Sequence, residues 1–221
     1  MPTSTYRDMK SGKMFGMIVC CVAYKGGVGK TALSVAAGAV AARETGQPVL
    51  LVDADPQGSA FTWSERAEEA GTPLPCATVS IPSTNLASRL AAMGTNRYAL
   101  VVIDAPPGSG AIVSSALEVA DVAILPTRPT TSDLDRLWPT WEAAEKAGTP
   151  ALVVLNMVRL GTKSLDAARS ALEAGGARVA RTVIPQREEI AQAFGRVPTG
   201  FLATAAGEVL REALELVSEH D

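Results

Sequence analysis

The chain has 221 residues, of which 47% are hydrophobic and 19% are charged, and its formal net charge is −3. This length and composition suit one compact domain and exclude a chain that is disordered throughout. No apolar run approaches the ~18–20 residues of a membrane-spanning helix, and the mild acidity argues against a globally basic nucleic-acid-binding protein.

Along the chain, short β-branched apolar runs alternate with longer Ala-rich stretches. Residues 1–16 are expected to form a polar, mobile lead-in, and residues 17–221 a single domain. The expected strands are Met17–Tyr24, Val49–Val52, Ala77–Ile81, Ala99–Ile103, Val122–Leu125, Leu152–Leu155 and Val179–Ile184. The expected helices lie near residues 30–45, 58–70, 84–94, 111–119, 133–147, 163–174, 187–194 and 203–219.

Most of these apolar runs are continuous, which is typical of strands buried on both faces. Glycines stand where the helices should end, as is usual after a helix: Gly46, Gly71, Gly94, Gly148 and Gly175. Repeated strand–helix–strand units predict right-handed crossovers. We therefore expect an α/β fold of the P-loop kind, with a mostly parallel, twisted sheet of about seven strands and helices on both faces.

The segment Lys25-Gly26-Gly27-Val28-Gly29-Lys30-Thr31 joins the first expected strand directly to the first expected helix. A glycine-rich turn exposes backbone N–H groups because no Cβ blocks an approaching anion, and the helix N-terminus adds further unpaired N–H groups. Lys30 is expected to reach the β- and γ-phosphates, and the Thr31 hydroxyl to coordinate Mg²⁺. The segment therefore predicts a nucleotide-phosphate site.

The loop departs from the ordinary pattern G-x-x-x-x-G-K-[ST], because Tyr24 replaces the first glycine and Lys25 follows it. In this deviant form, K-G-G-x-G-K-[ST], the sequence resembles the ParA/MinD family of P-loop ATPases. The resemblance implies that ATP or ADP and Mg²⁺ bind here and that Lys25 reaches across a dimer interface to the partner's nucleotide. Ala32 stands where many members have a second threonine, which removes one hydroxyl contact to phosphate.

The second expected strand leads into Asp53-Ala54-Asp55-Pro56-Gln57-Gly58. Asp53 and Asp55 share one side of an extended segment at the carboxyl edge of the sheet, where ligands bind in such folds. The family has D-x-D-P-Q-G here, and this resemblance implies that Asp55 orients the attacking water while Asp53 supports the magnesium shell. The open alternative is an Asp-Pro turn in which Asp53 caps a helix.

The fourth expected strand is apolar and ends at Asp104, as expected of a Walker B carboxylate that is presented to Mg²⁺ or its waters. Ala105-Pro106-Pro107-Gly108 is expected to form a stiff loop near the γ-phosphate, and it matches the D-x-P-P switch of the family. The alternative is that Asp104 caps the helix near residue 111. The predicted metal-side residues are thus Thr31, Asp53 and Asp104, and the predicted catalytic residues are Lys25, Lys30 and Asp55.

Asn156 follows the sixth expected strand, where a side-chain amide can pair with a purine edge through one donor and one acceptor. The resemblance implies that Asn156 reads adenine and that Pro185 and Gln186 flank the base. A turn role for Asn156 is the alternative. The predicted nucleotide-binding set is therefore Lys25, Gly26, Gly27, Val28, Gly29, Lys30, Thr31, Ala32, Asn156, Pro185 and Gln186.

The resemblance covers about residues 17–215 and is strongest to small ParA-type plasmid partition ATPases that lack an N-terminal helix-turn-helix domain. It implies a cytoplasmic, weak ATPase in which MgATP drives a sandwich dimer, the dimer binds DNA nonspecifically and hydrolysis resets it. The implied partners are a second copy, nonspecific DNA and a small ParB-like adaptor, with no membrane.

A basic stripe is compatible with residues 151–207, which carry more Lys and Arg than Asp and Glu. The candidate DNA-binding residues are Arg159, Lys163, Arg169, Arg178, Arg187 and Arg196. A solvated face of mixed charge explains the same composition equally well.

Other proteins with this loop fit less well. A MinD-like ATPase would end in a basic amphipathic membrane helix, whereas residues 208–221 are acidic. Iron–sulfur carriers need paired cluster cysteines, but Cys20, Cys21 and Cys76 lack that spacing and favour reduced thiols. A metabolic ligase that forms amides would need a substrate site of its own, and the sequence offers no Cys-His-Glu triad for one. A ParA-like ATPase that positions a chemotaxis cluster or another large assembly remains an open alternative.

Overall fold

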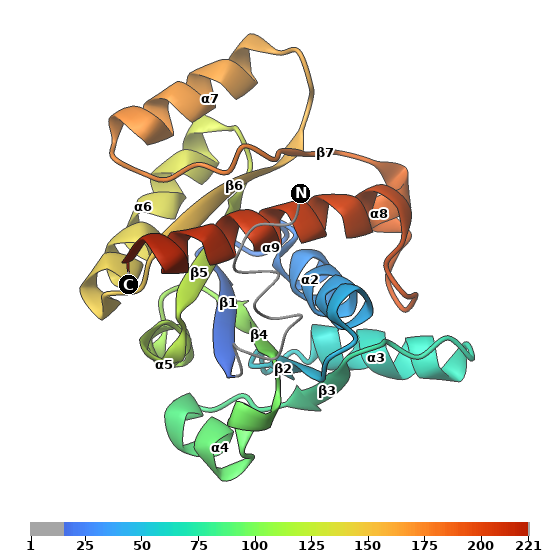
Figure 1. The fold of residues 1–221 in the computed structure, drawn as a ribbon. Coiled ribbons are helices and arrows are strands. Elements are labelled where there is room, and N and C mark those ends of the chain that lie inside the picture. Colours follow the sequence, from blue (N-terminus) through green and yellow to red (C-terminus); the bar gives the residue numbers. More distant parts are fainter. Residues whose placement is uncertain (1–15, 221) are drawn as a thin grey trace.

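The structure is a computed structural model that describes residues 16–220, so the lead-in predicted for residues 1–16 lies outside the described residues apart from Gly16. Its seven-stranded sheet has the order β3-β2-β4-β1-β5-β6-β7, and every neighbouring pair is parallel (Figure 1). The strands are β1 (Met17–Ala23), β2 (Val49–Asp53), β3 (Ala77–Ser80), β4 (Leu100–Pro107), β5 (Val122–Thr127), β6 (Ala151–Val158) and β7 (Ile184–Pro185). The predicted α/β fold is confirmed.

Helices cover both faces of this sheet. They are α2 (Lys30–Thr45), α3 (Ser59–Glu69), α4 (Leu86–Ala92), α5 (Ala111–Val119), α6 (Thr131–Ala147), α7 (Lys163–Ala174), α8 (Glu188–Ala191) and α9 (Gly200–His220), with a 3-10 turn η1 (Thr95–Arg97) before β4. Between residues 16 and 220, every helix is too short or too polar to cross a bilayer.

The central strands are buried on both faces because their alternate side chains enter two separate hydrophobic clusters. In β1, Val19 and Cys21 pack in the cluster that contains α2, α3 and α9, whereas Cys20 and Val22 pack in the cluster that contains α4 to α7. Figure 1 shows α2 and α9 beside one another on one face of the sheet. Burial on both sides explains why the apolar runs are continuous rather than alternating.

The strand predicted over Val179–Ile184 is wrong in most of its length. Val179 forms an isolated bridge to Val153, and the strand itself is only Ile184–Pro185. The intervening N–H groups of Arg181 and Thr182 donate instead to the carboxylate of Glu212 in α9, at 2.6 and 3.0 Å. A side chain thus replaces a neighbouring strand as the hydrogen-bond acceptor.

Two strands run further toward the ligand-binding edge than expected. β4 continues through Pro107, which pairs with Ala23 of β1, so the predicted stiff loop after Asp104 is largely strand. β6 continues to Val158 through an irregularity at Met157, whose φ is +53°. Asn156 therefore lies inside β6 rather than at its end.

The helix ends follow the expected glycines at Gly46 and Gly148, which both adopt left-handed conformations after α2 and α6. After α7, Gly175 has a φ of −79° and Gly176 is the left-handed residue. The helix expected near 187–194 is shorter than predicted, and the last helix begins earlier, at Gly200.

Candidate functional site

The carboxyl ends of β1, β2 and β4 bring the predicted phosphate loop and two carboxylates together. Residues 24–29 leave β1 and enter α2 at Lys30. Asp53 and Asp104 are register partners on the neighbouring strands β2 and β4, and Cys21 of β1 pairs with Asp104 from the other side. This edge is where open parallel sheets bind ligands.

Gly29 is the position in the loop that leaves no room for a side chain. Its φ is +89°, and a Cβ built there would lie 2.3 Å from Nδ2 of Asn156. The first turn of α2 has no side-chain cap and no acidic residue. Its free N–H groups and the positive end of the helix dipole are therefore available to an anion.

Lys30 is a buried cation, with only 7% of the residue exposed. No carboxylate among residues 16–220 forms a salt bridge with it. Burial lowers the pKa of Lys30, and the nearby charges of Asp104 and Asp55 only partly oppose this. Because an unpaired buried ammonium is costly, a phosphate anion would supply the negative charge that this position lacks.

Thr31 and Asp104 form an oxygen-rich pair beneath the loop. Asp104 accepts hydrogen bonds from Thr31 Oγ1 at 2.7 Å and from Ser34 Oγ at 2.9 Å. Burial raises the pKa of Asp104 to about 7, although these two hydroxyl groups oppose the shift. Hydroxyl and carboxylate oxygens are ligands that Mg²⁺ prefers, and Mg²⁺ usually completes its shell with water and phosphate.

Residues 16–220 contain no cluster of three or more His, Cys, Asp or Glu side chains that would form an all-protein metal cage. The hydroxyl of Thr31 and the carboxylate of Asp104 are two oxygen donors that fit a Mg²⁺ ion whose other ligands are water and phosphate.

Asp53 shows the contacts of the capping alternative. Its Oδ2 accepts from the N–H of Phe61 in the first turn of α3 at 2.8 Å, and its Oδ1 accepts from Asp55 N at 3.1 Å. Burial raises the pKa of Asp53, while these backbone bonds oppose the shift. Both oxygens are thus used within the chain, and the metal role of Asp53 stays a prediction.

Asp55 lies directly after this turn, is partly exposed, and its Oδ1 accepts from Gln57 N at 2.9 Å. Its charge acts on Lys30 of the phosphate loop, and its Oδ2 is not used in the bond to Gln57. The predicted role in orienting water remains a prediction.

Lys25 forms an ion pair that the sequence analysis missed. Its Nζ lies 2.5 Å from Oδ1 of Asp133, whose side chain is only 3% exposed, and Thr130 Oγ1 donates to the other oxygen at 2.8 Å. Burial raises the pKa of Asp133, but the bonds from Lys25 and Thr130 and the nearby charges outweigh burial, and the pKa lies below its usual value. Within one chain, Lys25 is therefore held by α6.

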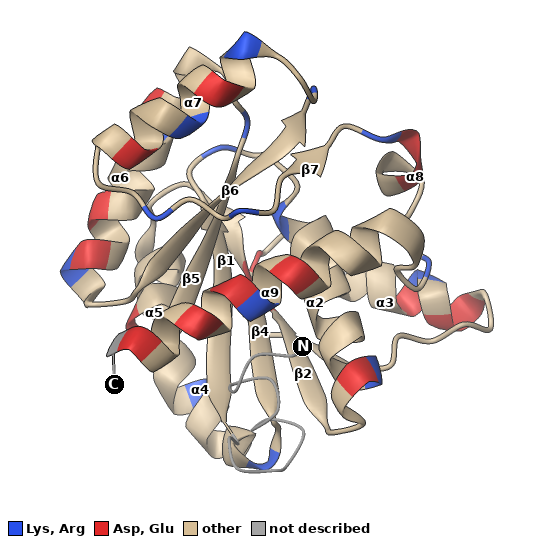
Figure 2. Ribbon diagram, turned by 45° about the horizontal axis from the view of Figure 1, so that its top comes forward, with Lys and Arg blue, Asp and Glu red and all other residues tan. Residues whose placement is uncertain are grey.

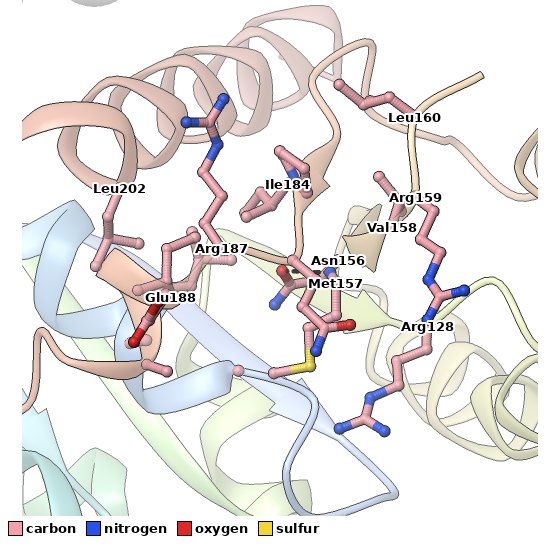
Figure 3. Close-up of a pocket in the computed structure, with 17 residues that line it drawn as sticks. Arg128, Asn156, Met157, Val158, Arg159, Leu160, Ile184, Arg187, Glu188 and Leu202 are labelled. Atoms are coloured by element: carbon pink, nitrogen blue, oxygen red, sulfur yellow. Dashed lines mark hydrogen bonds between the residues drawn. The ribbon is translucent and has the colours of Figure 1, made fainter. Parts of the chain in front are cut away.

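A cavity of about 1040 Å³ opens beside the phosphate loop (Figure 3). The predicted base contacts Asn156, Pro185 and Gln186 all line it, together with Ala32 on α2 and Leu202 on α9. Its size and mostly apolar lining suit a nucleoside-sized ligand.

The amide of Asn156 is already engaged by the backbone. Its Nδ2 donates to Val28 O at 2.7 Å, and its Oδ1 accepts from Met157 N at 2.8 Å. Asn156 therefore joins β6 to the phosphate loop, and only its second N–H and second lone pair remain for a base.

Three of the candidate DNA-binding residues, Arg169, Arg178 and Arg187, make contacts within the chain. Arg178 pairs with Glu219 at 3.0 Å, Arg169 pairs with Glu173 at 3.5 Å, and the Arg187 guanidinium lies 4.3 Å above the Phe201 ring. Figure 2 shows the acidic positions along α9 beside the segment that leads to β7. Among the described residues, only Arg159, Lys163 and Arg196 of this set have side chains without a contact of this kind.

The chain is similar to several known proteins. The family model described as "CobQ/CobB/MinD/ParA nucleotide binding domain" matches residues 19–197. "Maintenance of carboxysome distribution protein A" of Gloeobacter kilaueensis is 38% identical over 173 residues, which cover 76% of each chain. "Chromosome-partitioning ATPase Soj" of Thermus thermophilus is 31% identical over 219 residues, 83% of this chain and 87% of that one.

Among solved structures, the septum site-determining protein MinD of Pyrococcus horikoshii, in complex with Mg-ADP, matches with a TM-score of 0.72 and 21% identity. The match covers 93% of this chain and 98% of that chain, and it shows that the two chains share a fold.

Gly29→Ala should weaken MgADP binding at least about tenfold, because a left-handed non-glycine residue costs ~1–2 kcal/mol and the new Cβ displaces Asn156 from Val28. Gly46→Ala is the matched control, since Gly46 also has a positive φ, +66°, but lies after α2, where no atom is within 4 Å of an added Cβ. Calorimetric titration of both variants checks this. Equal affinity of the two variants would refute the assigned loop geometry.

Asp133→Asn keeps the shape of the side chain but removes the charge that pairs with Lys25. Because the folded pKa of Asp133 lies below its unfolded value, the carboxylate stabilises the fold above about pH 4 and loses this effect at lower pH. Urea unfolding should therefore show a wild-type advantage at pH 7 that shrinks below about pH 4. Asp135→Asn, at an exposed position of the same helix, should show no such pH dependence. A pH-independent advantage would exclude the ion pair as its source.

Proposed function

The chain belongs to the ParA/MinD family of P-loop ATPases, and from this premise we propose that it is an ATP-dependent switch that positions a large assembly inside the cell. The observation that carries the nucleotide part is Lys30, a buried ammonium that lacks a paired carboxylate at the base of the phosphate loop. ATP would bring the phosphates, and Thr31 and Asp104 would hold Mg²⁺, which neutralises charge on the transferred phosphoryl group.

Different parts of the site would bind the phosphates, the attacking water and the base of the nucleotide. The loop N–H groups and Lys30 bind and orient the phosphates. Asp55 would orient the attacking water. Asn156, Pro185 and Gln186 would hold the base in the cavity, where the apolar lining excludes water.

Lys25 would couple the nucleotide to dimerisation. Within one chain it is paired with Asp133, so it must leave this carboxylate before it can reach a nucleotide in a second copy. The negative charge of the γ-phosphate would stabilise Lys25 in its new position and compensate for the lost contact with Asp133. Loss of the γ-phosphate on hydrolysis would favour return of Lys25 to Asp133 within the chain. ATP hydrolysis would therefore be slow, and the protein would act by forming and dissolving the dimer rather than by rapid turnover of ATP.

Two observations favour a large assembly as the cargo. The 38% identical relative is named for the distribution of carboxysomes, which are large assemblies. The predicted DNA-binding arginines are in part committed to ion pairs and to an aromatic ring. A partner protein that links the dimer to its cargo is part of this proposal.

DNA segregation is the second candidate, and the 31% identity to a chromosome-partitioning ATPase favours it. In that case the dimer would bind DNA without sequence preference, and a ParB-like adaptor would link it to the segregated DNA. Lys163, at the start of α7, and Arg159, in the segment before it, are exposed cations without an ion pair among the described residues and could contact phosphate.

The Asp55→Ala variant should form a dimer when MgATP is added and stay monomeric with MgADP, because the γ-phosphate is retained and can bind Lys25 of a second copy. Light scattering coupled to size exclusion measures this. Adding Lys25→Ala to Asp55→Ala should abolish the dimer. A monomer under all conditions, from protein that binds ATP, would contradict the switch.

Arg159→Glu with Lys163→Glu should weaken MgATP-dependent retention on nonspecific DNA by at least about tenfold, since each lost phosphate contact lowers salt-sensitive binding. Arg89→Glu with Lys146→Glu is the control, because it changes the net charge equally at two exposed positions elsewhere. Equal retention of both double variants would refute this DNA surface. No retention of the wild type would remove DNA segregation as a candidate.

A further inference from the structure

Two consecutive carbonyl groups of the phosphate loop are each bound by a side chain from outside the loop. Arg128 Nη2, from the segment after β5, donates to Gly27 O at 2.8 Å, and Asn156 Nδ2, from β6, donates to Val28 O at 2.7 Å. Arg128 and Asn156 both line the large cavity, and in Figure 3 the Arg128 side chain points toward the pale blue loop between β1 and α2.

These bonds determine where the loop N–H groups point. In a planar trans peptide the C=O and N–H groups point in opposite directions, and the described residues contain no cis peptide bond. The Gly27 carbonyl shares its peptide with the N–H of Val28, and the Val28 carbonyl shares its peptide with the N–H of Gly29. Holding the two carbonyls outward therefore turns these two N–H groups to the opposite side of the loop.

The guanidinium of Arg128 leaves part of its hydrogen-bonding capacity unused, so contacts elsewhere in the fold do not explain its position. Its Nε is buried without a hydrogen-bond partner among the described residues, and a buried unsatisfied donor is costly. Among those residues, no salt bridge joins Arg128 to a carboxylate. The placement of the guanidinium is better explained by its contact with the loop.

We propose that Arg128 and Asn156 are positioning residues that clamp the phosphate loop in its anion-binding conformation, so that the Val28 and Gly29 N–H groups are oriented before a diphosphate arrives. The clamp rests on the proposed nucleotide site. It gives Arg128 a role that does not require contact with the ligand, and it gives Asn156 a role that is independent of the base.

Preorganisation has a measurable signature. Donors that are already oriented need no ordering when the anion binds, so removing the clamp should weaken binding of the phosphates while leaving the fold intact. Inorganic pyrophosphate is the informative probe because it has no base. A loss of pyrophosphate affinity therefore reports on the loop and not on the adenine contact predicted for Asn156.

The test titrates magnesium pyrophosphate and MgADP into the wild type, Arg128→Ala, Asn156→Ala and Arg89→Ala. The last variant removes one positive charge from an exposed position on α4 and controls for net charge. Arg128→Ala and Asn156→Ala should each weaken both ligands at least about tenfold, as expected for a lost hydrogen bond to a charged donor or a released loop. Arg89→Ala should change neither affinity more than about twofold.

A residue-specific readout separates positioning from simple destabilisation. Thermal unfolding without ligand should show that Arg128→Ala folds, and amide exchange in the MgADP complex should show lost protection at Val28 N–H while the α2 interior stays protected. If Arg128→Ala binds pyrophosphate as the wild type does, or if its Val28 amide stays protected, the clamp is refuted although the nucleotide site stands. If the wild type itself binds neither ligand, the proposed nucleotide site fails first.

Discussion

An ammonium group buried at the start of α2, without a carboxylate paired to it, is the constraint on which the rest of the site depends. Lys30 sits at the first turn of α2, beneath a loop whose glycines expose backbone donors. Carboxylates lie near it, and Asp104 has the largest effect of these on the pKa of Lys30. Asp104, however, accepts hydrogen bonds from the hydroxyl groups of Thr31 and Ser34 rather than from Lys30. The arrangement concentrates positive potential where the phosphates of a nucleotide would lie. The carboxylate of Asp104 stays beside Thr31, where Mg²⁺ would bind.

The segment after β5 and the first turn of α6 contact this loop at two places. Asp133 holds the Lys25 side chain, and Arg128 binds the backbone at Gly27. A movement of the loop on nucleotide binding would therefore alter the contacts of α6, and a movement of α6 would alter those of the loop. The geometry thus gives a physical route between the nucleotide site and α6.

Much of the fold followed from local pattern. Continuous apolar runs identified the strands because both faces of the sheet are covered, and the loop motif located the phosphate site because strand, glycines and helix are consecutive in sequence. The position of Asp104 was also readable, since an apolar strand that leads into an acid at the carboxyl edge of a parallel sheet brings that acid to the ligand-binding side.

What escaped prediction depends on contacts between distant parts of the chain. Asp133 is 108 residues from Lys25, and Arg128 is 101 residues from Gly27. In sequence, Thr130 and Asp133 look like an ordinary helix start, which they also are. The ion pairs of the basic segment escaped prediction for the same reason, because the acids that pair with Arg178 and Arg181 belong to α9, beyond the segment in which the charges were compared.

The most direct test of the account is thermal unfolding of the wild type and Lys30→Met, each with and without MgADP. Methionine fills a similar volume without charge. The account predicts that Lys30→Met is at least as stable as the wild type without ligand, because an unpaired buried charge is removed, and that MgADP no longer raises its melting temperature. A variant that is clearly less stable without ligand and is still stabilised by MgADP as strongly as the wild type would contradict it.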